Sequence, residues 1–229
     1  SFIAVLFYLK PIRIKSDYNS WKFLRESFPM MLSSAILVVL GWIDTFILGI
    51  FESDDVVGIY SVSLKIATLT SFGLQAINSI LAPKISAAYK QEDMITFKKL
   101  IRFSTRLNFL ITLLLISVII IFHRYILEFF GEEFLAGSII LLILCIGQVV
   151  NSLSGSVGVI LQMTGHQTKF RNFVLIALIT NIILNLIFTP IYGAIGIAVS
   201  TVISMALWNL LGTIYLKKKL NIITYYNFR

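Results

Sequence analysis

The chain has 229 residues, of which 58% are hydrophobic and only 13% charged, with a mean hydropathy of +0.91 and a net charge of +8. Soluble domains carry about 25% charged residues, so this composition excludes a soluble enzyme and indicates a protein of the lipid bilayer. The basic residues are divided among several loops and no recognition motif accompanies them, so the charge does not indicate nucleic-acid binding.

The first segment, residues 1–9, is apolar but too short to cross about 30 Å of hydrocarbon. We interpret it as the tail of a truncated membrane span, so the chain is expected to be the C-terminal part of a longer protein whose N-terminal half is missing. Residues 10–28 form a basic cytoplasmic linker that includes a short amphipathic elbow at Ser20–Arg25. Pro29 then begins the first complete span.

Six charge-poor stretches follow, each long enough to supply the roughly 20 residues that a membrane-spanning helix needs. They are predicted at about 29–51, 56–82, 105–127, 134–162, 171–189 and 193–216. Only Pro190-Ile191-Tyr192 separates the last two, which predicts a hairpin turn there. The fold class is therefore all-α, a polytopic integral membrane protein with an N-terminal stub and a six-helix transmembrane bundle over residues 29–216.

The loop charges predict the orientation of the spans, because cytoplasmic loops are rich in Lys and Arg. Apart from Lys65 and Arg124, every basic residue falls on one predicted side, in the linker, the loop between the second and third spans, the loop after the fourth span and the tail 217–229. The opposite loops are acidic. The basic tail, and with it the C-terminus, is therefore predicted to be cytoplasmic.

The loop 83–104 combines apolar and basic residues at helical spacing, which predicts an amphipathic helix lying on the membrane surface and anchored on anionic lipid. The apolar residues are Met94, Phe97, Leu100 and Ile101, and the basic residues are Lys98, Lys99 and Arg102.

Two ionisable residues, Asp44 and Lys65, fall inside predicted spans, where a charge is costly enough that a function is the default hypothesis. Both are expected roughly 10 to 14 Å below the outer boundary, on adjacent antiparallel helices. Asp44 is therefore predicted either to pair with Lys65 or to take part in ion coupling.

Lys65 belongs to a polar stripe on one face of the second span, which indicates a wet cavity. The stripe contains Ser61, Lys65, Thr68, Gln75 and Ser79. Since a lysine amine can hold an anion as a point charge, the fitting ligand is a phosphate or carboxylate. The predicted substrate-binding residues are Lys65, Ser61, Thr68 and Gln75, with Gln148 from the fourth span.

Asn181 and Asn185 lie one turn apart in the fifth span and are predicted either to line the cavity or to form hydrogen bonds between helices. The sequence has no nucleophile elbow, no phosphate-binding glycine loop and no metal-spaced cluster. We therefore expect no catalytic residues, no metal site and no cofactor.

Several motifs resemble the polysaccharide transporters, the O-antigen and repeat-unit flippases of the multidrug, oligosaccharidyl-lipid and polysaccharide exporter (MOP) superfamily. They are 42–49 (Trp-Ile-Asp-Thr-Phe-Ile-Leu-Gly), 54–66 (Asp-Asp-Val-Val-Gly-Ile-Tyr-Ser-Val-Ser-Leu-Lys-Ile), 81–86, 163–169, 181–185 and 190–198. Their order and spacing extend over nearly the whole chain.

The resemblance implies a transporter of two six-helix bundles around a central cavity, working by alternating access and coupled to a cation (H⁺ or Na⁺), with this chain forming most of the second bundle. It also implies that the substrate is an undecaprenyl-diphosphate-linked oligosaccharide, moved across the bacterial inner membrane for polysaccharide biosynthesis. In the related lipid II flippases a cavity-facing cation follows a Tyr-containing segment, and Lys65 occupies the matching position, with Lys in place of the more usual Arg.

Two other functions remain open from the sequence. A cation-coupled multidrug exporter of the same superfamily should have an acidic cavity rather than one containing Lys65. A membrane-embedded glycan polymerase or acyltransferase should have a cluster of Arg, His or acidic residues at one outer face, where the predicted loops are short.

Overall fold

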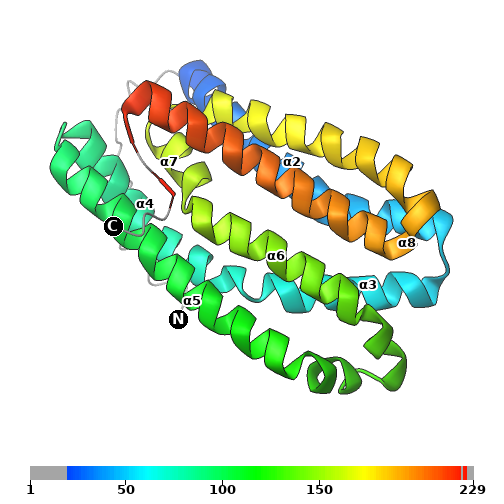
Figure 1. The fold of residues 1–229 in the computed structure, drawn as a ribbon. Helices are drawn as coiled ribbons and strands as arrows, with labels where there is room; N and C mark the ends of the chain where they lie inside the picture. The colour runs from blue at the N-terminus through cyan, green and yellow to red at the C-terminus, as the bar shows by residue number, and fades with distance from the viewer. Residues whose placement is uncertain (1–19, 223, 226–229) are drawn as a thin grey trace, which may run out of the picture.

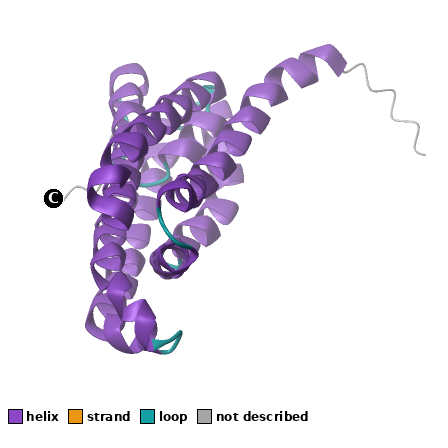
Figure 2. Ribbon diagram, turned by 90° about the vertical axis from the view of Figure 1, so that its right-hand side faces the viewer, coloured by secondary structure: helices purple, strands orange, loops and turns teal. Residues whose placement is uncertain are grey.

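The computed structural model describes residues 20–222, 224 and 225, with side chains from residue 27 onward. The predicted stub 1–9, the linker up to residue 19 and the last residues of the tail lie outside these ranges. The described chain is helical, with short loops and no strand, which confirms the all-α class (Figure 2).

The described helices pack side by side along one common direction (Figure 1). In chain order they are α2 Ser20–Phe51, α3 Asp54–Thr68, α4 Ser71–Lys90, α5 Met94–Glu128, the 3₁₀ turn η1 Glu132–Gly137, α6 Ser138–Ser154, α7 Val157–Met163 and α8 Gln167–Leu220.

The two ends of the bundle carry different charges. The turns after α2 and α5 contribute Glu52, Asp54, Asp55, Glu128, Glu132 and Glu133, and we call this the acidic end. The α4–α5 turn and the end of α8 contribute Lys90, Lys98, Lys99, Lys217, Lys218 and Lys219, and we call this the basic end.

Among the described residues, 4 helices are long and apolar enough to cross a membrane, or up to 5 if the bent pair α3 and α4 counts as one span. These segments are Ser27–Phe51, Met94–Glu128, Glu132–Ser154 and Gln167–Leu220, with Asp54–Thr68 and Ser71–Lys90 as the bent pair. Many of their large apolar side chains are exposed, as expected of helices that face lipid.

The 54-residue helix α8 reverses direction at Gly193, whose φ of 56° and ψ of −138° are not helical. Its two limbs lie against each other (Figure 1), because Asn181 Nδ2 donates a hydrogen bond to Ser204 Oγ at 3.3 Å across 23 positions of the sequence. The hairpin predicted at Pro190-Ile191-Tyr192 is thus confirmed. A straight helix of this length would extend about 80 Å, far more than a bilayer.

Two predicted spans are broken rather than continuous. The second span bends by 44° between α3 and α4, at Leu69 and Thr70. The fourth span is interrupted at Gly155, where φ is 74° and ψ is −154°. A Cβ at Gly155 would collide with Thr105 Oγ1 and lie 3.0 Å from the backbone oxygen of Thr224, so only glycine fits there.

The predicted surface helix in the loop 83–104 is a different structure. The amphipathic pattern is present, with Phe97 and Ile101 fully buried and Lys98 exposed, but residues 94–104 are the first turns of the 35-residue helix α5. They pack on α4 in a helical hairpin. In the same way, the predicted elbow Ser20–Arg25 is continuous with the first span, because α2 runs through Pro29 without a break.

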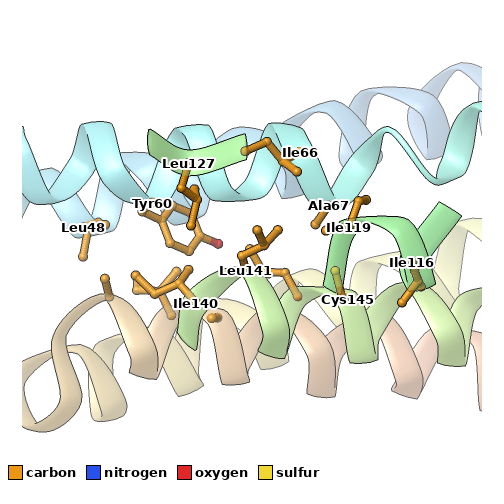
Figure 3. Packing of buried hydrophobic residues seen from close by; sticks show 14 of the residues in the cluster. Leu48, Tyr60, Ile66, Ala67, Ile116, Ile119, Leu127, Ile140, Leu141 and Cys145 are labelled. Carbon is orange, nitrogen blue, oxygen red and sulfur yellow. The ribbon is translucent and has the colours of Figure 1, made fainter. Parts of the chain in front are cut away.

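Two apolar clusters hold the bundle together. The cluster nearer the acidic end contains Leu48, Tyr60, Leu127 and Leu141, and also buries Cys145, which is 1% exposed (Figure 3). The second cluster, nearer the basic end, joins α4, α5, α7 and α8 through Ile85, Phe97, Ile160, Phe170 and Leu216. The cavity described next lies along helices α2, α3, α6 and α8.

Candidate functional site

A cavity of about 500 Å³ lies among α2, α3, α6 and the second limb of α8. Its polar lining residues are Asp44, Thr45, Ser61, Lys65, Thr68, Gln148, Asn151 and Thr201, and two indoles, Trp42 and Trp208, also line it. Each helix contributes about two turns, or roughly 10 to 12 Å, of its length. The volume is within the usual range of small-molecule sites.

The structure brings four of the predicted substrate-binding residues together here. Ser61, Lys65 and Thr68 follow one another along α3, and Gln148 adds an amide from α6. Lys65 lies in the last turn of α3, where the helix ends in the middle of the predicted span. The partial negative charge of a helix C-terminus favours a cation at this position, which offsets part of its desolvation cost.

Gln75 is placed elsewhere. It lies on α4, beyond the break, and is not among the residues that line the cavity. Its side chain is exposed and donates to Ser71 Oγ at 3.4 Å. The predicted stripe assumed one continuous helix, and the 44° bend between Thr68 and Ser71 separates Gln75 and Ser79 from the three residues before it.

Asp44 is buried, with 1% of its surface exposed, and accepts hydrogen bonds from four neutral side chains. Asn185 Nδ2 and Asn181 Nδ2 donate to its Oδ1 at 2.8 and 3.0 Å. Thr201 Oγ1 and the Tyr60 hydroxyl donate to its Oδ2 at 2.6 and 3.1 Å. Three helices, α3 and both limbs of α8, are thereby connected to the carboxyl group on α2.

Lys65 and Asp44 line the same cavity, but the described residues show no ion pair between them. The four neutral donors already occupy both carboxyl oxygens of Asp44. Lys65, whose side chain is exposed, is therefore unpaired at the cavity.

Asn181 and Asn185 are both fully buried, and neither lines the cavity. They hold Asp44 and each other, since Asn185 Nδ2 also donates to Asn181 Oδ1 at 3.1 Å. Of the two alternatives from the sequence, the structure contains the interhelical hydrogen bonds. The side-chain oxygen of the other asparagine, Asn185 Oδ1, is buried and has no hydrogen-bond partner.

The sequence analysis missed Tyr60, Thr201, Asn151, Trp42 and Trp208. Asn151 has a signal in the sequence, because it follows Gln148 by three positions and so shares its helix face. Thr201 and Tyr60 have none, since each meets Asp44 only through the packing of distant helices. Over the described ranges, no three His, Cys, Asp or Glu side chains are grouped as metal ligands would be.

Comparison with protein families gives a match to the MatE family over residues 29–191, which is most of the chain and includes Asp44, Lys65 and Gln148. The chain belongs to the MatE family. This family is part of the MOP superfamily, so the resemblance found in the motifs is confirmed. Its relatives are transporters and flippases rather than enzymes.

Two curated relatives of this MatE chain come from Haloferax volcanii. One is the probable low-salt glycan biosynthesis flippase Agl15, 28% identical over 182 residues, which are 79% of this chain and 39% of the relative. The other is the probable flippase AglR, 27% identical over 180 residues, covering 77% of this chain and 38% of the relative. The chain thus spans about two fifths of the length of each.

A solved structure of a MOP superfamily transporter from Pyrococcus furiosus has the same fold, with a TM-score of 0.63 at 18% sequence identity. The matched region covers 90% of this MatE chain and 46% of the Pyrococcus furiosus transporter.

Proposed function

We propose that the whole protein is a flippase that moves a polyprenyl-diphosphate-linked oligosaccharide from the cytoplasmic to the outer leaflet by alternating access. In bacteria this carrier is undecaprenyl diphosphate and the membrane is the inner membrane. The glycan flippases among the relatives support the substrate class. No covalent chemistry is needed, because the molecule that leaves the cytoplasmic leaflet is the same molecule that enters the outer leaflet.

The observation that carries the proposal is the position of Lys65. The Lys65 side chain is exposed and lines a cavity of about 500 Å³ together with hydroxyl and amide side chains, and no carboxylate is paired to it in the described chain. Once lipid and the proposed second bundle surround this cavity, an uncompensated cation there is costly unless a ligand supplies the negative charge. A diphosphate supplies it, and Lys65 would attract it as a compact point charge.

We further propose that Asp44 binds the coupling cation, H⁺ or Na⁺. Its surroundings support this role because they are rich in oxygen: the carboxylate, the hydroxyls of Tyr60 and Thr201, and the unpartnered Asn185 Oδ1. Hard cations prefer such oxygen ligands. Amide orientation is assigned from the hydrogen-bond network, so the two asparagines could turn their oxygens toward a cation.

The proposed architecture has six membrane crossings. The limbs of α8 count as two, α3 with α4 as one broken span, and α6 with α7 as another, alongside α2 and α5. Broken helices that line a cavity are common in secondary transporters. A second bundle, from the part of the protein outside this chain, would complete the cavity, and the basic end would face the cytoplasm.

The test uses the full-length protein in a strain that lacks it, and measures lipid-linked oligosaccharide in the outer leaflet. Lys65→Ala should abolish export while the protein remains inserted, and Lys65→Arg should restore at least part of it. Glu132→Gln, which removes a charge on the exposed acidic end, is the matched control and should export normally. Normal export by Lys65→Ala would remove Lys65 from the site. If wild type restores no export and instead changes drug efflux or glycan polymerisation, the flippase function itself is rejected.

A further inference from the structure

Besides Asp44, Thr45 and Thr201, the polar residues of the cavity form two sets on different helices. The set on α3 is Ser61, Lys65 and Thr68, which offers a cation and hydroxyl groups. The other set is Gln148 and Asn151 on α6 with Trp208 on the second limb of α8, which offers two amides and an aromatic face. The second set has no net charge, so it suits an uncharged part of a ligand, whereas the first set suits an anionic part.

Gln148 is the key residue of the uncharged set. It lines the cavity with only 5% of its surface exposed, and its amide makes no hydrogen bond within the described residues. The Gln148 amide atoms are not among the fully buried atoms without a partner, so they are accessible from the cavity, where a polar ligand or water can satisfy them. The amide offers both a donor and an acceptor.

Asn151 lies three residues after Gln148 and therefore one turn further along the same face of α6. Its Oδ1 accepts a hydrogen bond from Asn209 Nδ2 at 3.1 Å, and Asn209 is fully buried. This bond fixes the orientation of the Asn151 amide and leaves its Nδ2 donors to the cavity. Two amides one turn apart, roughly 5 Å along the helix axis, can each bind a different hydroxyl group of the same glycan.

Trp208 supplies an apolar surface near the two amides. It follows Thr201 by two turns along α8 and lines the cavity. The Phe170 ring packs edge to face against its indole, at a centroid distance of 5.9 Å. A sugar ring has hydroxyl groups around its rim and an apolar face of C–H bonds. Amides for the rim and an indole for the face are complementary to both parts.

We propose that Gln148, Asn151 and Trp208 form a sugar-binding subsite, separate from the phosphate-attracting Lys65. This inference rests on the proposed function, because it assigns the glycan part of the same lipid-linked substrate. The diphosphate lies at Lys65 on α3, and the first sugars lie against α6 and the second limb of α8. Recognition of the sugar is therefore carried by uncharged groups.

The experiment compares two ligands on the purified full-length protein in nanodiscs. The first is the lipid-linked glycan extracted from the source cells, and the second is the same lipid trimmed to its polyprenyl diphosphate. Gln148→Ala and Asn151→Ala should each weaken binding of the glycan-bearing lipid about tenfold and leave the trimmed lipid within about twofold. Lys65→Ala should weaken both. Trp208→Phe should retain more affinity for the glycan-bearing lipid than Trp208→Ala.

Gln162→Ala, an amide on α7 that does not line the cavity, is the matched control. Gln148→Ala carries the test, since it removes no hydrogen bond seen in the described chain and should not impair folding. The subsite is rejected if Gln148→Ala and Asn151→Ala change both ligands equally or neither. It is also rejected if wild type binds the two lipids equally, although the flippase function would then stand. If wild type binds neither lipid, the proposed function fails first.

Discussion

Asn185 Nδ2 lies 2.8 Å from Asp44 Oδ1, although the two residues are 141 positions apart in the sequence. The contact joins the first limb of α8 to α2. It also places the one buried carboxyl group of the described chain among neutral donors rather than beside Lys65. The role of Asp44 can therefore be tested apart from that of Lys65.

We predict that Asp44→Asn folds but loses ion coupling. The new amide can keep its oxygen toward Asn181 and Asn185, while the hydroxyls of Tyr60 and Thr201 can turn to accept from its NH₂ group. The unfolding temperature should therefore fall only slightly, whereas export in membrane vesicles should no longer respond to a Na⁺ or H⁺ gradient. Full gradient-driven export by this variant would mean that Asp44 is structural.

Asp44→Leu gives the contrasting result. It removes the acceptor that four donors share. Thr201 can still donate to the Ile197 oxygen and Tyr60 to Thr201 Oγ1, but Asn181 and Asn185 each lose the acceptor of one amide N–H, and an unsatisfied buried group costs about 1 to 3 kcal/mol. We expect a large loss of thermal stability in detergent, measured by intrinsic tryptophan fluorescence of the full-length protein. Stability equal to that of Asp44→Asn would show that the four hydrogen bonds contribute little to the packing of α2 against α8.

Alanine substitutions should separate the glycines that shape the backbone from those that do not. Gly155→Ala should destabilise most, because its φ of 74° disfavours a side chain and the added Cβ would meet Thr105 and the Thr224 backbone. Gly193→Ala has the strained φ of 56°, but its Cβ would meet only the flexible end of Glu52, at 2.8 Å. We therefore expect it to lower the free energy of unfolding by about 1 to 3 kcal/mol. Gly58→Ala, in helix α3 with nothing within 4 Å, should be neutral or stabilising. An equal effect at all three positions would contradict this ranking, which thermal unfolding measures.

Asp93 predicts a pH dependence at the basic end. It caps α5 by accepting a hydrogen bond from the Thr96 backbone N–H at 3.0 Å. Hydrogen bonds from Thr96, its side chain first and then its backbone, lower the pKa of this carboxyl group below its ordinary value of 3.8. Because the pKa is lower in the folded protein, the cap contributes fully above the ordinary value of 3.8. Its contribution is lost as the pH falls through the folded pKa.

Hydrogen exchange of the first turn of α5 measures this cap. At neutral pH, Asp93→Ala should exchange faster than wild type in this turn. Below about pH 4 the wild-type protection should approach that of the alanine variant, whereas Asp93→Asn, whose amide does not titrate, should keep its protection. If Asp93→Ala and wild type are equally protected at neutral pH, the cap does not stabilise the helix.

The sequence was sufficient for the all-helical class and for the two ionisable residues inside predicted spans. Runs without charge identify membrane helices because lipid cannot satisfy the backbone in any other way. Asp44 and Lys65 stand out in such runs for the same reason. The hairpin near Gly193 could also be predicted, since the uncharged stretch there is twice as long as one span needs.

The break between α3 and α4 was missed because no Gly or Pro marks it. Its signal is a run of hydroxyl residues: Thr68 donates to the Lys65 oxygen at 2.9 Å, Thr70 to the Ala67 oxygen at 2.8 Å, and Ser71 to the Thr68 oxygen at 2.7 Å. Such bonds compete with the helix hydrogen bonds and bend it. The partners of Asp44 could not be predicted at all, because one sequence does not show which helices pack together.

The proposed six-crossing topology predicts which loops share a side of the membrane. Glu132 and Tyr192 lie at turns of the acidic end, and Gln91 lies in the α4–α5 turn of the basic end. In a cysteine-free full-length protein, Glu132→Cys and Tyr192→Cys should react with an impermeant maleimide added outside, and Gln91→Cys only after permeabilisation. The decisive residue is Tyr192, which is 61% exposed. Its labelling from the same side as Gln91 would mean that the two limbs of α8 do not cross the membrane twice, and the six-span arrangement would be wrong.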